Sequence, residues 1–327
     1  MDESIKFCKK ILGKVSRSFA LTIPMLDDDI YLPVLITYLQ DRLLDNFEDE
    51  LTEDDISLAE RREMMDNVVK LFNPEVEKTE VIVNKLIEYA PLMPEKPLQK
   101  LTAEAGILRK AYDQLDSETK KISFKWLKEM NKGMQKYLTR SVDTFEDLNE
   151  YCYYVAGTVG GFLTDTIILK ENIDRENSAQ LKENFNDAGL FLQKVNLIRD
   201  IKKDIKNREK NYWPLKSFEI KETELMDKTN KDKAMSILTE MLYDVKGHIG
   251  ALLDYYQALP DSLPGYRKFY CVNNALGIAT IDKMEDNPGI FYGRKKVKVA
   301  KLDFMKILKD PETAFTKKAE SFLSRQI

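Results

Sequence analysis

The chain has 327 residues, of which 43% are hydrophobic and 32% are charged, and its formal net charge is −4 at pH 7. This length suits one large domain or two ordinary ones, each able to bury a sizeable core. The slightly acidic balance argues against a general nucleic-acid binder, because such proteins carry a basic field. No uninterrupted apolar stretch approaches the roughly 18 residues that a membrane span needs.

Cysteine and histidine are sparse. The three cysteines are odd in number and far apart in the sequence, which does not suggest a disulfide framework. The N-terminal residues MDESIKFCKK lack the apolar core of a signal peptide, so we expect a soluble, cytoplasmic protein of a reducing compartment. The single histidine, His248, lies in a helical pattern and is expected to be structural. Any catalysis must therefore rely on carboxylates, cations, tyrosines and a bound metal or cofactor.

Apolar residues recur at helical spacing along almost the whole chain, without a convincing pair of alternating strands. The predicted helices cover 34–48, 53–72, 78–90, 98–116, 118–140, 146–169, 177–207, 231–258, 266–284 and 311–325. Turn signals such as Asn73-Pro74 separate them, and Pro33 suits the first turn of the first helix. Neither a long polar linker nor an internal repeat appears. The sequence therefore predicts one all-α domain, residues 1–327, with about ten to twelve helices.

The predicted helix 34–48 and the residues after it carry an acidic face. Tyr38, Arg42, Asp45 and Asp49 follow one another at helical intervals, and Glu48 lies beside them. The other face is a leucine and phenylalanine stripe that can pack in a core. One side of this helix therefore presents a phenol, a guanidinium and three acids.

The predicted helix 177–207 also has a polar face with acids at helical intervals. Its polar face carries Gly189, Gln193, Asn196, Asp200 and Asp204, and Arg199 directly precedes the first acid. Two helices that each offer a D-x-x-x-D pair can hold Mg²⁺ if they face one another, because Mg²⁺ prefers oxygen ligands together with substrate phosphates. Such a site would bind a diphosphate and neutralise the charge that develops as it leaves.

Acids at this spacing also occur on solvent-exposed helix faces. On spacing alone, such a face is a commoner explanation for a D-x-x-x-D pair than a metal site. The segment Asp143–Asp147 shows the same pattern within this chain. There, Thr144 and Asp147 have the spacing of a capping box at the start of a helix, so we assign that copy to capping.

Residues 151–165 place Tyr154, Gly157 or Thr158, Gly161 and Asp165 along one predicted helical face. Each glycine in a helix costs about 1 kcal/mol relative to alanine, so something should compensate. Either two helices pack closely there, or the glycines line a cavity for a long apolar substrate. In the second case Tyr154 would face the cavity, where aromatic rings stabilise a carbocation and a phenol handles a proton.

Two further stretches carry cations. Residues 16–19 (SRSF) place hydroxyls and a guanidinium between two helices, in a turn of the kind that binds phosphate. Residues 294–298 (RKKVK) follow a Pro-Gly turn. Such a run is usually a solvated surface; the alternative is that it binds the phosphates of a nucleotide cofactor.

Together, five stretches resemble the squalene and phytoene synthase family. They are SRSFALTIP, YLQDRLLDNFEDE, EYCYYVAGTVGGF, GLFLQKVNLIRDIKKDIKNREKNYWP and FYCVNNALGIATIDKMEDNPGIFYGRKKVKV, in family order across residues 16–299. The last stretch is more similar to the squalene synthases than to the phytoene synthases. The resemblance implies an all-α, single-domain isoprenoid-synthase bundle with a central active-site cavity.

The resemblance also implies a two-step reaction that uses Mg²⁺ and NADPH. Two farnesyl diphosphates condense head to head into presqualene diphosphate, which ionises again, rearranges and takes a hydride from NADPH to give squalene. The alternatives are a non-reductive relative that stops at dehydrosqualene, phytoene or an alcohol, and a non-catalytic interaction protein. No nucleic acid and no obligate protein partner are expected. The apolar substrate and product suit peripheral contact with the cytoplasmic face of a membrane.

Roles for single residues are carried over from the same resemblance. The metal-binding positions are Asp45, Glu48, Asp49, Asp200 and Asp204. The positions that contact diphosphate or cofactor are Tyr38, Arg17, Arg42 and Arg199. Tyr154 matches the tyrosine of first-step catalysis, and the positions near the nicotinamide cofactor are Asn196, Lys296 and Lys298.

The sequence departs from the family pattern at three lysines. Lys203 stands where an acid usually precedes the last aspartate of the second motif, and Lys210 and Lys298 stand where arginine is usual. Lysine keeps the positive charge but loses the bidentate geometry of a guanidinium. These departures bear on the affinity for Mg²⁺ and for NADPH.

Overall fold

The computed structural model describes residues 2–16, 18–52, 54–208 and 210–324, and over these residues every regular element is a helix. The predicted all-α class is therefore confirmed. The chain divides into two compact units, Met1–Thr139 with Phe162–Asn172, and Arg140–Gly161 with Ile173–Ile327. A single domain over the whole chain stays a prediction.

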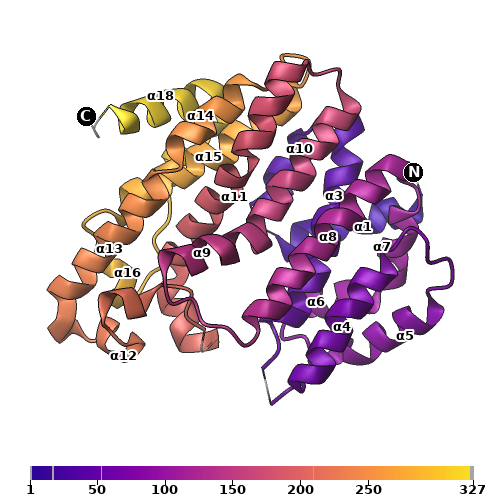
Figure 1. The fold of residues 1–327 in the computed structure, drawn as a ribbon, viewed down its shortest axis with the longest axis horizontal. Helices are drawn as coiled ribbons and strands as arrows, with labels where there is room; N and C mark the ends of the chain where they lie inside the picture. Colours follow the sequence, from indigo (N-terminus) through magenta and orange to yellow (C-terminus); the bar gives the residue numbers. More distant parts are fainter. Residues whose placement is uncertain (1, 17, 53, 209, 325–327) are drawn as a thin grey trace. The chain divides into compact units, whose positions relative to one another are not determined.

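The first unit is built on α3 (Asp28–Asp49) (Figure 1). Leu35, Leu39, Leu43 and Phe47 recur once per turn and are completely buried, as predicted. Against α3 pack α1 (Glu3–Val15), α4 (Leu58–Leu71), α6 (Lys96–Ala103), α7 (Ala105–Tyr112) and α8 (Ser117–Tyr137). The unit also contains α2 (Phe19–Thr22), η1 (Ile23–Met25), α5 (Glu80–Tyr89), η2 (Ala90–Leu92) and the end of α10 (Thr158–Lys170).

Helix α3 begins six residues before its predicted start, and Pro33 lies inside it rather than in its first turn. A proline at that place removes one backbone hydrogen bond. Asp28 and Asp29 lie in the first turn, where their negative charges are favourable beside the positive end of the helix dipole. The acidic face at the far end of α3 is thus carried on a helix of 22 residues.

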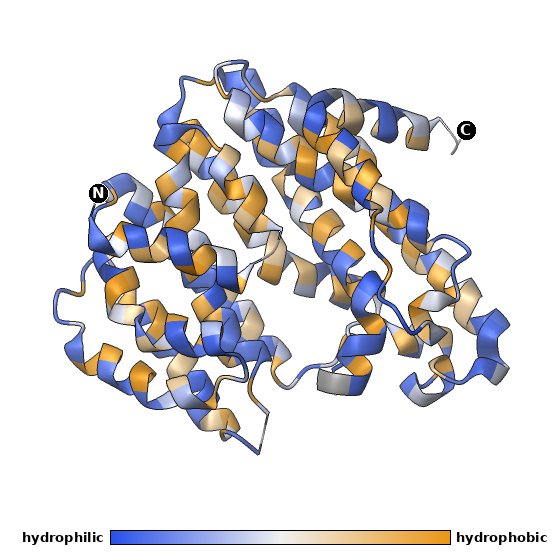
Figure 2. Cartoon of the chain, turned by 180° about the vertical axis from the view of Figure 1, so that it is seen from behind, coloured by the Kyte–Doolittle hydropathy of each residue, from blue (hydrophilic) through white to orange (hydrophobic). Residues whose placement is uncertain are grey.

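The second unit is built on α11 (Arg175–Lys203), a helix of 29 residues. Against it pack α9 (Phe145–Cys152), the π-helix η3 (Tyr153–Gly157), α13 (Lys231–Lys246), α14 (Ile249–Gln257), α15 (Pro264–Met284) and α16 (Gly289–Tyr292). The remaining elements are the π-helix η4 (Asp204–Arg208), η5 (Leu215–Phe218), α12 (Glu222–Leu225), η6 (Lys228–Asn230), α17 (Lys301–Lys309) and α18 (Pro311–Leu323). In Figure 2 hydrophobic and hydrophilic residues alternate along the helices, as expected of amphipathic helices.

The helices are shorter and more numerous than predicted. The predicted helix 98–116 is interrupted at Glu104, and 231–258 at Gly247 and His248. Helix α4 begins only at Leu58, because Ser57 and Glu60 form a complete capping box at its start. The capping assignment of Thr144 and Asp147 is confirmed at the start of α9.

Glycines bring η3 and α10 into close contact with α11. A Cβ at Gly189 would lie 2.5 Å from the carbonyl oxygen of Ala156, and one at Gly160 would lie 2.5 Å from that of Phe185. A Cβ at Gly157 would overlap the side chain of Asn186. Because backbone cannot move aside as a flexible side chain can, close helix packing explains Gly160 and Gly189, which supports the first of the two alternatives above.

The single histidine belongs to a polar cluster between α11 and α13. Lys194, only 1% exposed, lies with its Nζ 2.6 Å from Asp244 Oδ2 and 2.8 Å from His248 Nε2. The other ring nitrogen of His248 lies 2.7 Å from Asp187 Oδ1. A buried lysine needs such partners, so the contacts support the structural interpretation of His248.

The continuous helical segment Phe145–Lys170 is long and apolar enough to cross a membrane, with a mean hydropathy of 1.3 over its best window. Half of that window is buried inside the protein, as in the core helices of many proteins. One such segment is therefore weak evidence for a span.

Candidate active site

The end of α3 gathers three acids. One carboxylate oxygen from each of Asp45, Glu48 and Asp49 lies within 4.8 Å of the others. Glu48 is 2% exposed, whereas Asp45 and Asp49 are partly exposed. The grouping follows from the helical period, which places residues three and four apart on one face. Three oxygen ligands on one rigid helix fit a hard divalent cation such as Mg²⁺.

Arg42 contacts this acidic cluster from one turn earlier. One guanidinium nitrogen forms an ion pair with Asp45, and the other donates to Glu50 Oε1 at 2.8 Å. The two carboxylates therefore hold the planar guanidinium in one orientation. The arrangement places a fixed positive charge beside the acids, where it can contact an anionic ligand.

Two more side chains of α3 approach the acidic cluster. The ring of Tyr38 lies 5.3 Å from that of Phe19, and burial raises the pKa of its phenol. Asp41 was not among the candidate site residues predicted from the sequence, although Asp41 precedes Asp45 by four residues. Burial, together with the charge of Asp45, raises the pKa of Asp41 to about 8. Asp41 is thus a proton-carrying acid at neutral pH.

The second motif lies at the end of α11, in the other unit. Lys296 Nζ lies 2.6 Å from Asp200 Oδ1, and Arg199 donates to Asp200 Oδ2 at 2.8 Å. Burial opposes the charge on Asp200, but these two cations outweigh it and hold the pKa of this carboxyl below its ordinary value. Asp204 is 5% exposed and begins η4, one turn after Asp200.

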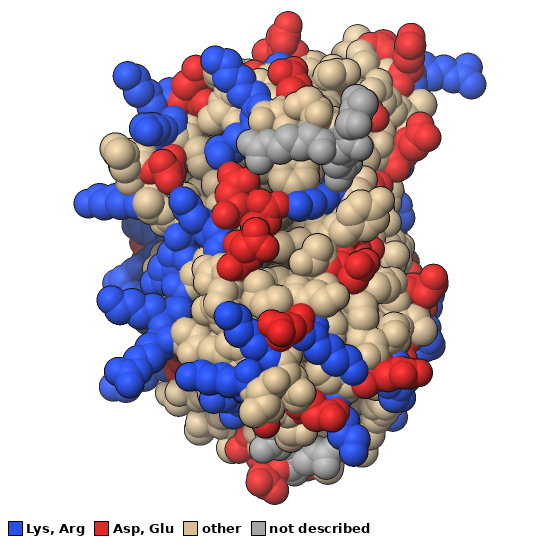
Figure 3. Space-filling model, turned by 90° about the vertical axis from the view of Figure 1, so that its left-hand side faces the viewer, with Lys and Arg blue, Asp and Glu red and all other residues tan. Residues whose placement is uncertain are grey.

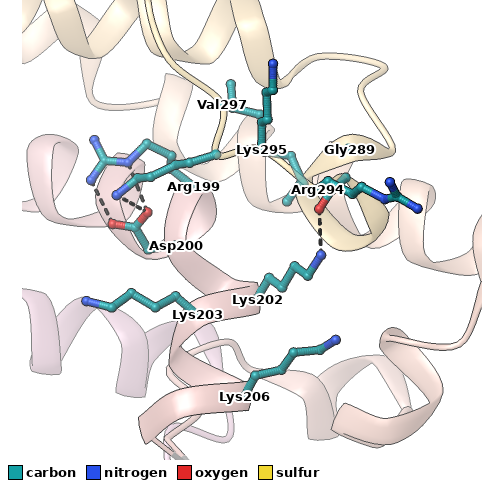
Figure 4. A pocket seen from close by; sticks show the side chains of 12 residues that line it. Arg199, Asp200, Lys202, Lys203, Lys206, Gly289, Arg294, Lys295 and Val297 are labelled. Atoms are coloured by element: carbon teal, nitrogen blue, oxygen red, sulfur yellow. Dashed lines mark hydrogen bonds and ion pairs between the residues drawn. The ribbon is translucent and has the colours of Figure 1, made fainter.

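A cavity of about 230 Å³ opens beside this motif, between the end of α11 and the segment that begins with α16 (Figure 4). Lys202 reaches from α11 to this segment and donates to the carbonyl oxygen of Gly293 at 2.6 Å. The charged lining residues are Arg199, Asp200, Lys202, Lys203, Lys206, Arg294, Lys295 and Lys296. Cations far outnumber acids in this lining, so the cavity suits a phosphorylated ligand.

The remaining candidate residues are distributed as follows. Tyr154 lies in η3, is 8% exposed, and its ring contacts that of Tyr153 at 5.2 Å. Asn196 is exposed on α11, and Lys298 is exposed and absent from the cavity lining. Lys203, despite its exposure, contributes to that lining. Arg17 lies outside the described residues.

The sequence singled out only some of the cavity lysines. Lys202 and Lys206 were not identified, although they lie four residues apart and Lys206 follows Lys203 by three residues. Figure 3 shows a face on which lysine and arginine side chains gather along one side, so the charges are unevenly distributed despite the small net charge. Local concentration of positive charge was therefore invisible in the composition.

The family model for squalene/phytoene synthase matches residues 12–303. The chain therefore belongs to the squalene/phytoene synthase family. This confirms the family that the five stretches indicated.

Individual relatives are squalene synthases. Squalene synthase LSS of Botryococcus braunii is 27% identical, over 91% of this chain and 62% of its own length. The squalene synthase of Nicotiana benthamiana is 31% identical, over 89% of this chain and 67% of its own length. The chain thus spans somewhat less than two thirds of the first of these relatives and about two thirds of the second.

A solved structure is similar to this chain in fold. The complex of TcSQS with the ligand BPH1237 is 27% identical and superposes with a TM-score of 0.84, covering 99% of this chain and 91% of that one. The helical architecture is thus that of a squalene synthase structure.

Proposed function

We propose that the protein is a squalene synthase, which condenses two farnesyl diphosphates into presqualene diphosphate and then converts this intermediate to squalene with NADPH. The observation that carries the proposal is the acidic cluster of Asp45, Glu48 and Asp49 with Arg42 fixed beside it. Such a set serves a reaction in which a diphosphate must be bound and released. The squalene synthase relatives support the choice of substrate.

The residues of α3 would bind the first diphosphate. Asp45, Glu48 and Asp49 would hold Mg²⁺, which neutralises the negative charge of the departing diphosphate when bound. Arg42 would contact the same phosphate oxygens, because Asp45 and Glu50 already orient its guanidinium. Tyr38, whose pKa is raised by burial, would stay protonated and donate a hydrogen bond.

Tyr154 would act in the first step. Its ring lies beside that of Tyr153 in η3, and a π face there can stabilise positive charge on carbon. Its hydroxyl would take the proton lost as the cyclopropane ring closes, or pass it to the departing diphosphate. The exposed fraction of 8% indicates that little water reaches it.

The residues of the second unit would bind the other charged groups. Asp200 and Asp204 would hold Mg²⁺, and Arg199 would contact a diphosphate. The cations of the cavity suit the phosphates of NADPH, which supplies hydride when bound. Lys296 lines this cavity, whereas Lys298 and Asn196 would have to reach the cofactor from outside the lining.

A product assay tests the proposal. The purified full chain is incubated with farnesyl diphosphate and Mg²⁺, with and without NADPH, and the extract is analysed by mass spectrometry. We expect squalene only with NADPH and presqualene diphosphate without it. Dehydrosqualene or an alcohol regardless of NADPH would support the non-reductive alternative. No product from farnesyl or geranylgeranyl diphosphate would favour a non-catalytic interaction protein.

A further inference from the structure

Helix α17 has two apolar sides, only one of which packs against the protein. Ile307 is buried and Phe304 and Leu308 are partly buried, facing the neighbouring α15 and α18. Leu302 and Met305 point the other way and remain 67% and 53% exposed. Leu302 and Met305 thus form an exposed apolar patch, and a patch of this kind with a polar rim can mark an interaction site.

Lysines surround these two residues. At about 100° per residue, the exposed arc of α17 carries Lys301, Met305, Lys309, Leu302 and Lys306 in angular order, which we call the basic-apolar face. Within the described part of the chain, none of its three lysines pairs with a carboxylate. The only acid of the helix, Asp303, lies at the edge of the buried side.

The charge extends beyond the helix. Across residues 294–309, Arg294 and six lysines accompany a single acid, Asp303. A second copy of the chain is therefore an unsuitable partner, because a two-fold interface would set this positive face against itself. A nucleic acid would use the lysines but would leave Leu302 and Met305 without an apolar environment. An anionic bilayer supplies both the negative charge and the apolar layer beneath it.

We propose that the basic-apolar face of α17 docks the protein on the surface of an anionic lipid bilayer, with Leu302 and Met305 inserted among the lipids and the lysines on the headgroups. The inward side of α17 keeps its contacts with α15 and α18 in this arrangement. The docking requires no catalytic residue, and it holds whether or not the proposed reaction is correct.

Sedimentation with lipid vesicles tests this docking. The full chain is mixed with vesicles of phosphatidylcholine and phosphatidylserine, or with vesicles of phosphatidylcholine alone. We expect binding to the first and at least tenfold weaker binding to the second, with release at high salt. Equal binding to the two kinds of vesicle, or binding to neither, would overturn the proposal.

Two variants separate the apolar and charged contributions. Changing both Leu302→Ser and Met305→Ser should weaken vesicle binding at least fivefold, and changing Lys301, Lys306 and Lys309 to Glu at least tenfold. A matched control carries Val81→Ser and Ile87→Ser, two exposed apolar residues of α5 without a lysine-rich surround, and should bind as the wild type does.

Folding and self-association are measured on the same variants. All altered side chains are exposed, so the melting temperatures should stay close to that of the wild type. Vesicle binding that is unchanged in both α17 variants would refute the role of this face. A wild-type dimer that the Leu302→Ser, Met305→Ser variant loses would assign the face to a second copy instead.

Discussion

Lys296 Nζ lies 2.6 Å from Asp200 Oδ1, so a lysine of the 294–298 stretch forms an ion pair with the first aspartate of the second motif. Arg199 holds the other oxygen of the same carboxylate at 2.8 Å. Both cations line the adjoining cavity. Asp200 thus connects the proposed metal site with the proposed cofactor site, and a metal ion on Asp200 would compete with Lys296.

Replacing Lys296 tests this competition. In Lys296→Met we expect Mg²⁺ to bind two- to fivefold more tightly, since a partly exposed ion pair of this kind is worth at most about 1 kcal/mol. NADPH should bind more weakly, because the cavity loses a cation. Isothermal titration with Mg²⁺ and with NADPH gives both values. Lys283→Met, an exposed lysine on α15, is the control, and an unchanged Mg²⁺ affinity in Lys296→Met would contradict the competition.

The acidic cluster on α3 should bind Mg²⁺ together with a diphosphate. Mg²⁺ with inorganic diphosphate should raise the melting temperature of the wild type, because a ligand that binds the native state stabilises it. Changing both Asp45→Asn and Glu48→Gln should reduce that rise and lower turnover at least about a hundredfold. Asp54→Asn, an exposed acid beyond the cluster, should change neither. A double variant with wild-type turnover would exclude the metal-binding role.

Close packing at Gly189 should make this glycine irreplaceable. A Cβ there would lie 2.5 Å from the carbonyl oxygen of Ala156 and 2.6 Å from the amide nitrogen of Gly157. We expect Gly189→Ala to lower the free energy of unfolding by about 2 kcal/mol or more. Gly250→Ala, on α14 with open space around it, should raise that free energy by up to about 1 kcal/mol. Urea unfolding of the two variants compares them directly, and equal effects would refute the packing argument.

Asp41 should make stability depend on pH in the absence of divalent metal. Its pKa is about 8 in the native state and about 4 in an unfolded chain, so the native state binds one more proton between these values. The free energy of unfolding should therefore fall as pH rises from 6 to 8, by at most about 1.4 kcal/mol per pH unit. Asp41→Asn should remove this slope. Parallel unfolding curves for wild type and variant across this range would contradict the assignment.

Much of the fold could be predicted from the period of the apolar residues. The stripe from Leu35 to Phe47 predicted which face of α3 is buried, and the same period placed Asp45, Glu48 and Asp49 together. Both follow from local helical geometry, which a sequence contains. Helix ends were less accurate, because Ser57 and its capping box, or the break at Gly247, depend on single residues rather than on a period.

Contacts between distant segments could not be predicted from patterns of this kind. The ion pair of Lys296 with Asp200 joins residues 96 positions apart, and nothing in either local sequence specifies it. The same holds for Lys194 and His248, which meet only because α11 packs against α13 and α14. Asp41 is the exception, since its spacing to Asp45 was visible and only its burial was not.

Transfer of deuterium from NADPH is the most direct test of the proposed function. The full chain is given farnesyl diphosphate, Mg²⁺ and NADPH that carries deuterium on the transferable position of the nicotinamide ring. The account predicts squalene that contains one deuterium atom, detected by mass spectrometry. Unlabelled squalene, or dehydrosqualene and alcohols formed equally well without NADPH, would contradict it.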